Sequence, residues 1–325
     1  MFYHGRADLP RVSIITPSYN QAQFLEETVL SVISQDYPHI EYIVIDGGSS
    51  DGSVDIIRKY ENRLAYWVSE PDRGQAHAIN KGWRRATGDI VAYLNADDVY
   101  TPDAITAAVR ALLANPEACM VYSDALFINE HGKIRKKYKA VPFDIHRTIE
   151  SNDGFIPQAT AFIRGYALDS IGLLDEGLHM VMDYDLWVRL GLRYPVTFLP
   201  GVYLAKVREH SSAKSTAAVD RFPIERRQVL NKVFSRNDLP VSIRDLRLKA
   251  YGHVAFMQAI LAGRSGQPDR ILSPLLHAMA GCPSSVARTP LTYYLIVRSL
   301  VPWWKGKPSL SSWYALDRIV ESLRT

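Results

Sequence analysis

Apolar residues in the first hundred positions occur alternately in short continuous runs and in helical spacing. The continuous runs are rich in β-branched and aromatic residues, which predicts four strands. The segments between them repeat apolar positions every three or four residues, as Leu25, Val29 and Val32 do, and predict helices. The predicted strands are RVSIIT, IEYIVID, RLAYWVSE and GDIVAYL, beginning at Arg11, Ile40, Arg63 and Gly88.

Strands that alternate with helices favour right-handed crossovers and a mostly parallel sheet that helices cover on both faces. The predicted fold class is therefore α/β. Ligands of such sheets bind at the carboxyl ends of the strands. Three of the predicted strands end in polar turns, TPSYN, DGGSSD and NADD, at residues 16–20, 46–51 and 95–98. The topology predicts that these turns lie along one edge of the sheet.

The pattern changes after the fourth strand. Thr101 is a suitable N-cap for a following helix, with Pro102 at its first position. A hairpin follows residue 119, and its second arm, KIRKKYK at 133–139, is expected to be a solvated, charged strand. From about Ser211 the spacing is helical throughout. We expect a catalytic domain at 1–215 and a C-terminal helical region at 216–325.

Composition limits the alternatives. The chain has 325 residues, of which 47% are hydrophobic and 22% charged, which suits a large folded core. A formal charge of +4 does not indicate a nucleic-acid binder. Two distant cysteines, Cys119 and Cys282, form neither a disulfide framework nor a zinc motif. The N-terminus lacks the layout of a secretory signal, so the predicted location is cytoplasmic.

The apolar segment near the C-terminus, LTYYLIVRSLVPWWKGKP, is interrupted by Arg298 and Pro302. It is too short to span a bilayer, which needs about 20 apolar residues. Either it forms a helix buried against the rest of the chain, or its aromatic and basic residues bind a membrane interface. The second alternative predicts peripheral contact with the inner face of the plasma membrane through the C-terminal helices.

The strand GDIVAYL ends next to two adjacent acids, Asp97 and Asp98. Like charges repel, so the pair indicates either a bound divalent cation or a turn before the next helix. Asp46 ends another strand and precedes two glycines and two serines, a pattern that suits either a ligand's polar edge or a tight turn. The chain contains neither GxGxxG nor GxxxxGK[ST], the usual dinucleotide and P-loop patterns.

Taken together, the segments VSIITPSYN, IEYIVIDGGSSDGS, EPDRGQAHAINKG and GDIVAYLNADD resemble the family 2 glycosyltransferases in order and spacing. The resemblance covers roughly residues 10–215. It implies a GT-A, Rossmann-like fold and an inverting transfer of sugar from a nucleotide-diphosphate sugar, with a UDP-sugar as the favoured donor. It also implies Mn²⁺ or Mg²⁺ as the cofactor, and a saccharide or lipid-linked saccharide acceptor of the kind used in polysaccharide or glycolipid synthesis.

The resemblance also implies roles for individual residues of the donor side. NADD corresponds to the family's metal-binding DxD motif, with Asn95 in place of its first acid. The metal is therefore expected on Asp98 and Asp97, with His210 as a further ligand. Arg208 and His210 match an Arg-x-His segment of a loop near the phosphates. The residues expected to bind the nucleotide sugar are Pro17, Tyr19, Asp46, Arg73, Gly74, Asn80, Lys81 and Asp97.

The acceptor side is implied by two further segments. VMDYDLWVRL resembles the segment with the catalytic base, where Met182 replaces the first of two acids and Asp183 matches the second. Asp183 is thus the expected base, and Asp185 a helper or a helix cap. The alternative is that both acids only favour the helix N-terminus. Gln158 and Thr160 are expected to line the acceptor side.

Two other functions remain open from the residues. A nucleotidyltransferase that makes nucleotide sugars would also use a Rossmann-like sheet and metal-bound acids, but TPSYNQAQ lacks the glycines and lysine of its phosphate loop. A non-catalytic nucleotide-sugar-binding protein would not need Asp97, Asp98 and Asp183 together.

Overall fold

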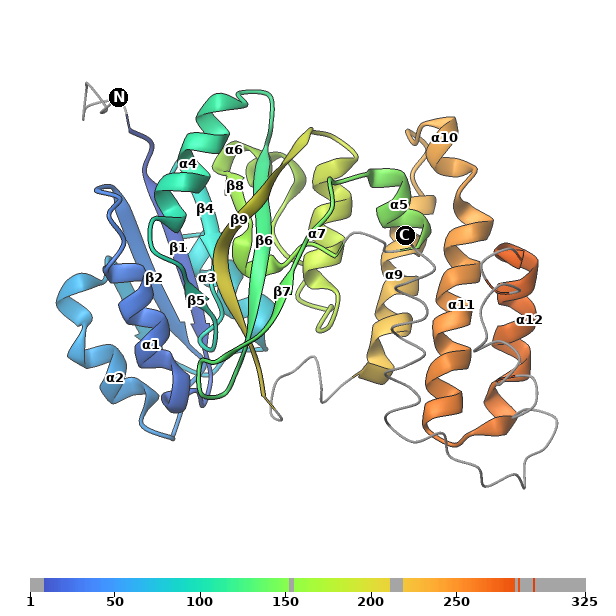
Figure 1. Ribbon diagram of the computed structural model, residues 1–325, viewed down its shortest axis with the longest axis horizontal. Helices are drawn as coiled ribbons and strands as arrows, with labels where there is room; N and C mark the ends of the chain where they lie inside the picture. Colours follow the sequence, from blue (N-terminus) through green and yellow to red (C-terminus); the bar gives the residue numbers. More distant parts are fainter. Residues whose placement is uncertain (1–8, 152–154, 211–218, 284–285, 287–294, 296–325) are drawn as a thin grey trace. The chain divides into compact units, whose positions relative to one another are not determined.

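The computed structural model describes residues 9–151, 155–210 and 219–283, together with Val286 and Leu295 (Figure 1). Its contacts divide the chain into two compact units, Met1–Ile145 with Gly154–Ala217, and His146–Asp153 with Ala218–Thr325. The boundary predicted at residue 215 falls outside the described residues. The second unit also includes a segment from the middle of the chain, which no local pattern in the sequence indicates.

The first half of the first unit has the predicted alternation of strands and helices, which confirms the α/β class. Its four strands are parallel and lie in the order β3-β2-β1-β4. Apolar residues of β1, β2 and β4 are buried because helices pack on the sheet. These elements are β1 (Val12–Ser18), α1 (Ala22–Ile33), β2 (Ile40–Asp46), α2 (Ser53–Lys59), β3 (Tyr66–Ser69), α3 (Gln75–Trp83) and β4 (Ile90–Tyr93), with a 3₁₀ turn at Glu61–Arg63.

The second half of the sheet is mixed. Strand β8 pairs antiparallel with β4 and β6, and β9 runs parallel to β6 but antiparallel to β5. The predicted hairpin is present as β6 and β7, which pair antiparallel. These elements are β5 (Val99–Tyr100), α4 (Ala104–Ala114), β6 (Met120–Asn129), β7 (Ile134–Tyr138), a 3₁₀ turn at Gln158–Thr160, β8 (Phe162–Arg164), α6 (Gly165–Ile171), α7 (Met182–Gly191) and β9 (Val196–Glu209).

Pro17 lies inside β1, although the sequence suggested that the strand breaks there. Strand β1 pairs with β2 as far as Ser18, but its pairing with β4 ends at Ile15. The carbonyl of Ile15 accepts the Leu94 N–H, so Ile15 and Pro17, two residues apart, both face the β4 side. Proline is tolerated because its missing N–H faces the side where pairing has already ended.

The predicted N-cap at Thr101 is wrong. Helix α4 begins at Ala104, and Asp103 occupies the N-cap position with a φ of 60°. Thr101 instead joins β9, because its N–H donates to Leu204 O and its hydroxyl donates to Tyr203 O. The first helical position is therefore not Pro102.

The described part of the second unit is helical (Figure 1). Helix α11 packs on α9 and α12, and the backbones of α11 and α12 approach closely where Gly252 meets Gly281. No helix in the described residues is long and apolar enough to cross a membrane. The segment 291–325 lies outside the described residues except for Leu295. The elements are α5 (Ile145–Glu150), α9 (Phe222–Phe234), α10 (Val241–Arg244), α11 (Arg247–Arg264) and α12 (Leu272–Gly281), with 3₁₀ turns at Val219–Arg221 and Pro268–Arg270.

Helix α3 needs a glycine where it crosses β1. A Cβ on Gly82 would lie 2.6 Å from Ile15 Cγ2, inside the core. We therefore expect Gly82→Val to lower the free energy of unfolding by about 1–3 kcal/mol in urea denaturation. Gln23→Val, at an exposed position of α1, is the matched control and should change it by only a few tenths. Equal effects of the two substitutions would contradict this packing.

Candidate functional site

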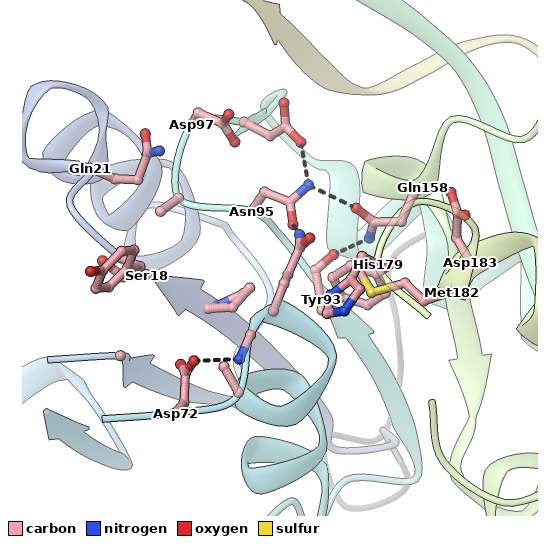
Figure 2. Close-up of a pocket in the computed structure, with 18 of the residues that line it drawn as sticks. Ser18, Gln21, Asp72, Tyr93, Asn95, Asp97, Gln158, His179, Met182 and Asp183 are labelled. Atoms are coloured by element: carbon pink, nitrogen blue, oxygen red, sulfur yellow. Dashed lines mark hydrogen bonds between the residues drawn. The ribbon is translucent and has the colours of Figure 1, made fainter. Parts of the chain in front are cut away.

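A cavity of about 850 Å³ opens at the carboxyl ends of β1, β2 and β4 within the first unit (Figure 2). This is the edge at which the sequence predicted the three polar turns to meet. Of the predicted site residues, the structure brings these to its lining: Pro17, Tyr19, Gly74, Asp97, Asp98, Gln158, Asp183 and Arg208. The others are not among the lining residues: Asp46, Arg73, Asn80, Lys81, Thr160, Asp185 and His210.

The turn after β4 presents Asp97 and Asp98 to the cavity. Asp98 is 4% exposed; its Oδ1 accepts the Arg208 N–H at 3.0 Å and its Oδ2 accepts a long hydrogen bond of 3.3 Å from Asn95. Burial raises the pKa of Asp98 well above its ordinary value, and the neighbouring charge of Asp97 raises it further. The Thr28 hydroxyl donates to the carbonyls of Ala96 and Asp98, which fixes the turn on α1.

Arg208 secures this turn from the β9 side. Its Nε donates to the carbonyl of Asp97 at 2.9 Å, and its guanidinium pairs with Glu27 at 2.5 Å. The same guanidinium donates to the carbonyls of Asn129 and Glu130. The side chain is 1% exposed, so these contacts occupy the guanidinium inside the protein. In this geometry Arg208 orients the acidic turn rather than presenting its charge to the cavity.

His210, at the end of β9, contacts the other acid. Its Nε2 lies 3.0 Å from Asp97 Oδ2, and its ring centroid lies 4.8 Å from that of Phe24. The histidine side chain is 4% exposed, whereas that of Asp97 is 20% exposed. His210 therefore supports Asp97 from behind, as seen from the cavity.

Asn95 is the centre of an amide network across the cavity wall (Figure 2). Its Oδ1 accepts Gln75 Nε2 at 2.6 Å, and its Nδ2 donates to Gln158 Oε1 at 3.3 Å. Gln158 in turn donates to the carbonyl of Tyr93 at 2.7 Å. A carboxylate in place of Asn95 would face both Asp98 and the Gln158 oxygen, so the neutral amide suits these neighbours.

Asp46 organises the loop after β2. Its carboxylate accepts four hydrogen bonds, from the N–H groups of Gly48 and Ser49 and from the hydroxyls of Ser49 and Ser69. It is completely buried. The carboxylate is thus occupied by its own loop, and its predicted contact with the nucleotide sugar stays a prediction.

Asp183 and Asp185 have different surroundings on α7. Asp183 lies in the first turn and lines the cavity beside Gln158 (Figure 2). Asp185 is buried and pairs with Arg189 at 2.8 Å, and Arg189 also donates to the carbonyls of Ile171, Gly172 and Leu173. Residues two positions apart on a helix do not share a face, so the two acids have different neighbours. Asp185 holds the preceding loop in place.

Asn80 anchors another part of the wall. It is 1% exposed, and its amide exchanges hydrogen bonds with the N–H and carbonyl of Leu174. It also donates to Glu176, which pairs with Arg73 at 2.5 Å. Arg73 and Asn80 therefore fasten the loop that leads to the cavity residues at 179–183. Lys81 pairs with Glu70.

Thr160, predicted on the acceptor side, is fully buried. Its hydroxyl donates to the carbonyl of Pro157 at 2.8 Å and lies 3.2 Å from both the N–H and the carbonyl of Ser123. It therefore joins the Gln158–Thr160 turn to β6 rather than facing the cavity.

Sequence reasoning missed several lining residues, including Asp72 and His179. Asp72 accepts the Gly74 N–H at 2.7 Å, and a Cβ on Gly47 would lie 2.6 Å from its Oδ2. The dipeptide Asp72–Arg73 carried a signal, since an acid two residues before a glycine commonly caps the turn. His179 follows no local pattern that would have found it.

Asp97 and Asp98 could together hold a polyphosphate ligand through a cation, and Asp183 lines the same cavity. In the described residues, no group of three or more His, Cys, Asp or Glu side chains could by itself hold a metal ion. A cation here would need ligands from its substrate as well as from Asp97 and Asp98. Such sharing is usual for Mg²⁺.

The fold resembles those of solved GT-A glycosyltransferases. TarS of Staphylococcus aureus in complex with UDP-GlcNAc matches with a TM-score of 0.64 and 16% identity, over 90% of this chain and 89% of that one. A mannosyltransferase of Pyrobaculum calidifontis in complex with GDP-Man and Mn²⁺ matches with a TM-score of 0.55 and 22% identity, over 93% of this chain and 89% of that one. Together with the cavity at the strand ends, this defines a GT-A fold.

Sequence comparison identifies the family. The model for glycosyl transferase family 2 matches residues 13–172. An uncharacterized glycosyltransferase of Rickettsia typhi is 30% identical over 65% of this chain and 68% of its own length. This chain belongs to glycosyltransferase family 2 and is a glycosyltransferase.

Other relatives match over a smaller share of their own length. A relative from Rickettsia felis is 30% identical, but the match spans only 35% of its length. A putative teichuronic acid biosynthesis glycosyltransferase of Bacillus subtilis is 44% identical over 29% of this chain and 38% of its own length.

The raised pKa of Asp98 predicts a pH dependence of stability without metal. Above the ordinary carboxyl pKa, the unfolded chain releases this proton while the folded protein retains it, so stability falls as pH rises toward the folded pKa. From about pH 4 upward, the free energy of unfolding in chelator should therefore decline more steeply for the wild type than for Asp98→Asn. Urea denaturation at several pH values measures this. Asp55→Asn, at an exposed acid of α2, is the control; identical slopes for wild type and Asp98→Asn would contradict the prediction.

Proposed function

We propose that this chain is an inverting glycosyltransferase that moves a sugar from a UDP-sugar to a hydroxyl of a saccharide or lipid-linked saccharide. A divalent cation, Mn²⁺ or Mg²⁺, binds at Asp98 and Asp97, and Asp183 is the base. The enzyme acts in polysaccharide or glycolipid synthesis, in the cytoplasm or at the inner face of the plasma membrane.

One observation carries the proposal: Asp183 from α7 and the acids after β4 line the same cavity, although about 85 positions separate them in the chain. Burial raises the pKa of the Tyr93 hydroxyl, and the charges of Asp183 and Asp98 raise it further. Tyr93 therefore lies near both acids. The cavity, at about 850 Å³, has the size of a cofactor or nucleotide site.

The residues of the acidic turn fit a divalent cation. Two adjacent carboxylates repel each other, and that repulsion contributes to the raised pKa of Asp98. Asp97 is partly exposed, and among the described residues Asp98 Oδ2 accepts only a 3.3 Å hydrogen bond from Asn95. A cation would neutralise this pair and, when bound, would offset the charge that develops on the departing diphosphate. His210, 3.0 Å from Asp97, either orients that carboxylate or becomes a further ligand.

The other residues of the cavity have separate tasks in this proposal. Asp183 accepts the proton of the acceptor hydroxyl as that oxygen attacks the anomeric carbon, and the displacement inverts the configuration there. Pro17, Tyr19 and Gly74 line the side where the nucleotide binds. Gln158, which contacts Asn95 and lies beside Asp183, lines the acceptor side.

The donor and the pathway are proposed from similar proteins. The TarS structure contains UDP-GlcNAc and the Pyrobaculum enzyme contains GDP-Man, so both similar folds bind nucleotide-diphosphate sugars. The Bacillus subtilis relative is named for teichuronic acid biosynthesis, which supports a role in polysaccharide assembly. The alternatives of a nucleotidyltransferase and a non-catalytic binding protein are disfavoured by membership of a glycosyltransferase family.

The proposal is tested by incubating the full chain with Mn²⁺ and each common nucleotide sugar, and measuring the nucleotide diphosphate released. Turnover or tight binding of a UDP-sugar supports it. If no nucleotide sugar is bound or consumed, with or without candidate acceptors, the proposal is wrong.

Two substitutions separate the proposed roles. Asp183→Asn should lower kcat by about 10²–10⁴-fold and leave the Kd for UDP nearly unchanged, because only the proton transfer loses its base. Asp98→Ala should instead abolish the Mn²⁺-dependent part of UDP binding in calorimetry. Asp185→Asn is the matched control for α7, where any loss should track stability. Equal losses of UDP binding and transfer in Asp183→Asn would contradict its role as base.

A further inference from the structure

The hairpin that contains β7 carries the excess positive charge of this protein. The hairpin stretch 129–141 contains five basic residues and one acid, a formal charge of +4, which equals that of the whole chain. The basic residues are Lys133, Arg135, Lys136, Lys137 and Lys139. The rest of the chain is therefore neutral overall, and the concentrated charge of this hairpin would attract a polyanion.

These cations are exposed and mostly without acidic partners. Residues 134–137 are exposed on both faces of the strand. Within the described part of the chain, Lys133, Arg135, Lys137 and Lys139 form no ion pair. Strand β7 pairs with β6 alone among the described strands, so its outer edge is not covered by another strand.

Aromatic rings adjoin the basic strand. The Tyr138 ring centroid lies 5.8 Å from that of Phe127 and 5.7 Å from that of Phe155, with both ring pairs edge to face. Lys136 Nζ lies 5.7 Å from the Tyr138 ring, within the range of a cation–π contact. Phe155 is 47% exposed, so part of its ring is open to solvent. The exposed Phe155 ring and the half-buried Tyr138 ring thus offer apolar faces beside the cations.

The aromatic residues connect this strand to the cavity. The Tyr138 hydroxyl donates to the carbonyl of Phe155, and Phe155 stands three positions before Gln158, which lines the cavity. Three residues of extended chain span at most about 10 Å, so the exposed ring begins within that distance of Gln158 Cα. Phe155, Tyr138 and Lys136 are thus in contact with one another, and the chain from Phe155 reaches Gln158 on the proposed acceptor side within three residues.

We propose that β7 with Tyr138 and Phe155 binds the extended part of an anionic saccharide acceptor, a chain that carries carboxylate groups. The terminal hydroxyl of this acceptor enters the cavity beside Gln158. The next sugars lie against the rings of Phe155 and Tyr138, and the acidic groups further along pair with the lysines and Arg135. The assignment to an acceptor rests on the proposed function; the surface itself does not.

Lysines also protect an exposed edge strand from pairing with another chain. That role needs charge alone and makes no use of Phe155. The saccharide surface requires both, so the ring and the cations must contribute to the same binding event.

The test uses the full chain and a fluorescein-labelled hexamer of α-1,4-galacturonate as the probe, followed by fluorescence anisotropy. The triple variant Arg135→Gln, Lys136→Gln, Lys137→Gln should raise the Kd about tenfold at low salt. The control Arg58→Gln, Lys59→Gln, Arg63→Gln removes the same charge from around α2 and should leave Kd within about twofold. Phe155→Ala should raise Kd by about threefold or more at about 0.2 M salt, where exposed charges are screened.

Three results would overturn the proposal. The two triple variants could raise the Kd for the hexamer equally, or Phe155→Ala could leave that Kd unchanged. Neutral maltohexaose could also displace the labelled hexamer as well as unlabelled galacturonate hexamer does. Binding of the strand to phosphatidylglycerol vesicles without binding of the hexamer would assign it to a membrane instead. UDP binding by calorimetry in the same variants reports on the donor side. If the wild type binds UDP normally but does not bind the hexamer, this surface is misassigned; if the wild type does not bind UDP at all, the proposed function fails by itself.

Discussion

The arrangement of the cavity depends on keeping two adjacent carboxylates in place inside a folded protein. Asp98 is almost fully buried beside Asp97. Two adjacent carboxyl groups without hydrogen-bond donors would destabilise the fold. Arg208 on β9 and Asn95 in the same turn donate to the Asp98 carboxylate, and Thr28 on α1 holds the turn by donating to the carbonyls of Ala96 and Asp98. These same contacts join the parallel half of the sheet to its mixed half. The acidic turn is therefore also a structural junction.

Positioning and chemistry are divided between neighbouring residues of the same motif. In the EPDRG segment, Gly74 and Asp72 line the cavity while Arg73 pairs with Glu176 outside it. On α7, Asp183 faces the cavity while Asp185 holds Arg189 and the preceding loop. Helix α3, through Asn80, fixes the loop that leads to α7. The two walls are thus mechanically connected through α3.

The sequence predicted the alternating half of the fold well, because buried parallel strands and amphipathic helices differ in period. It also located the cavity, since the ends of parallel strands meet. The roles of single polar residues were harder to predict. Arg208 and Asn80 carry a charge or an amide that suits a ligand, yet Arg208 donates to the carbonyl of Asp97, 111 positions away, and Asn80 pairs with the backbone of Leu174, 94 positions away. Thr101 failed as a cap because β9, about a hundred positions later, takes its hydrogen bonds. Local patterns carry no information on such contacts.

Strand β1 has unequal partners on its two sides. It stays paired with β2 through Ser18, but its pairing with β4 stops at Ile15, so three residues of β1 extend past β4. At about 3.3 Å per residue, this overhang opens a notch of roughly 10 Å in the sheet. Pro17 stands in that notch and has no N–H with which β4 could be extended. Pro17 thus prevents further pairing between β1 and β4, and the sheet does not extend over the binding site. The cavity begins where the hydrogen bonds between these two strands end.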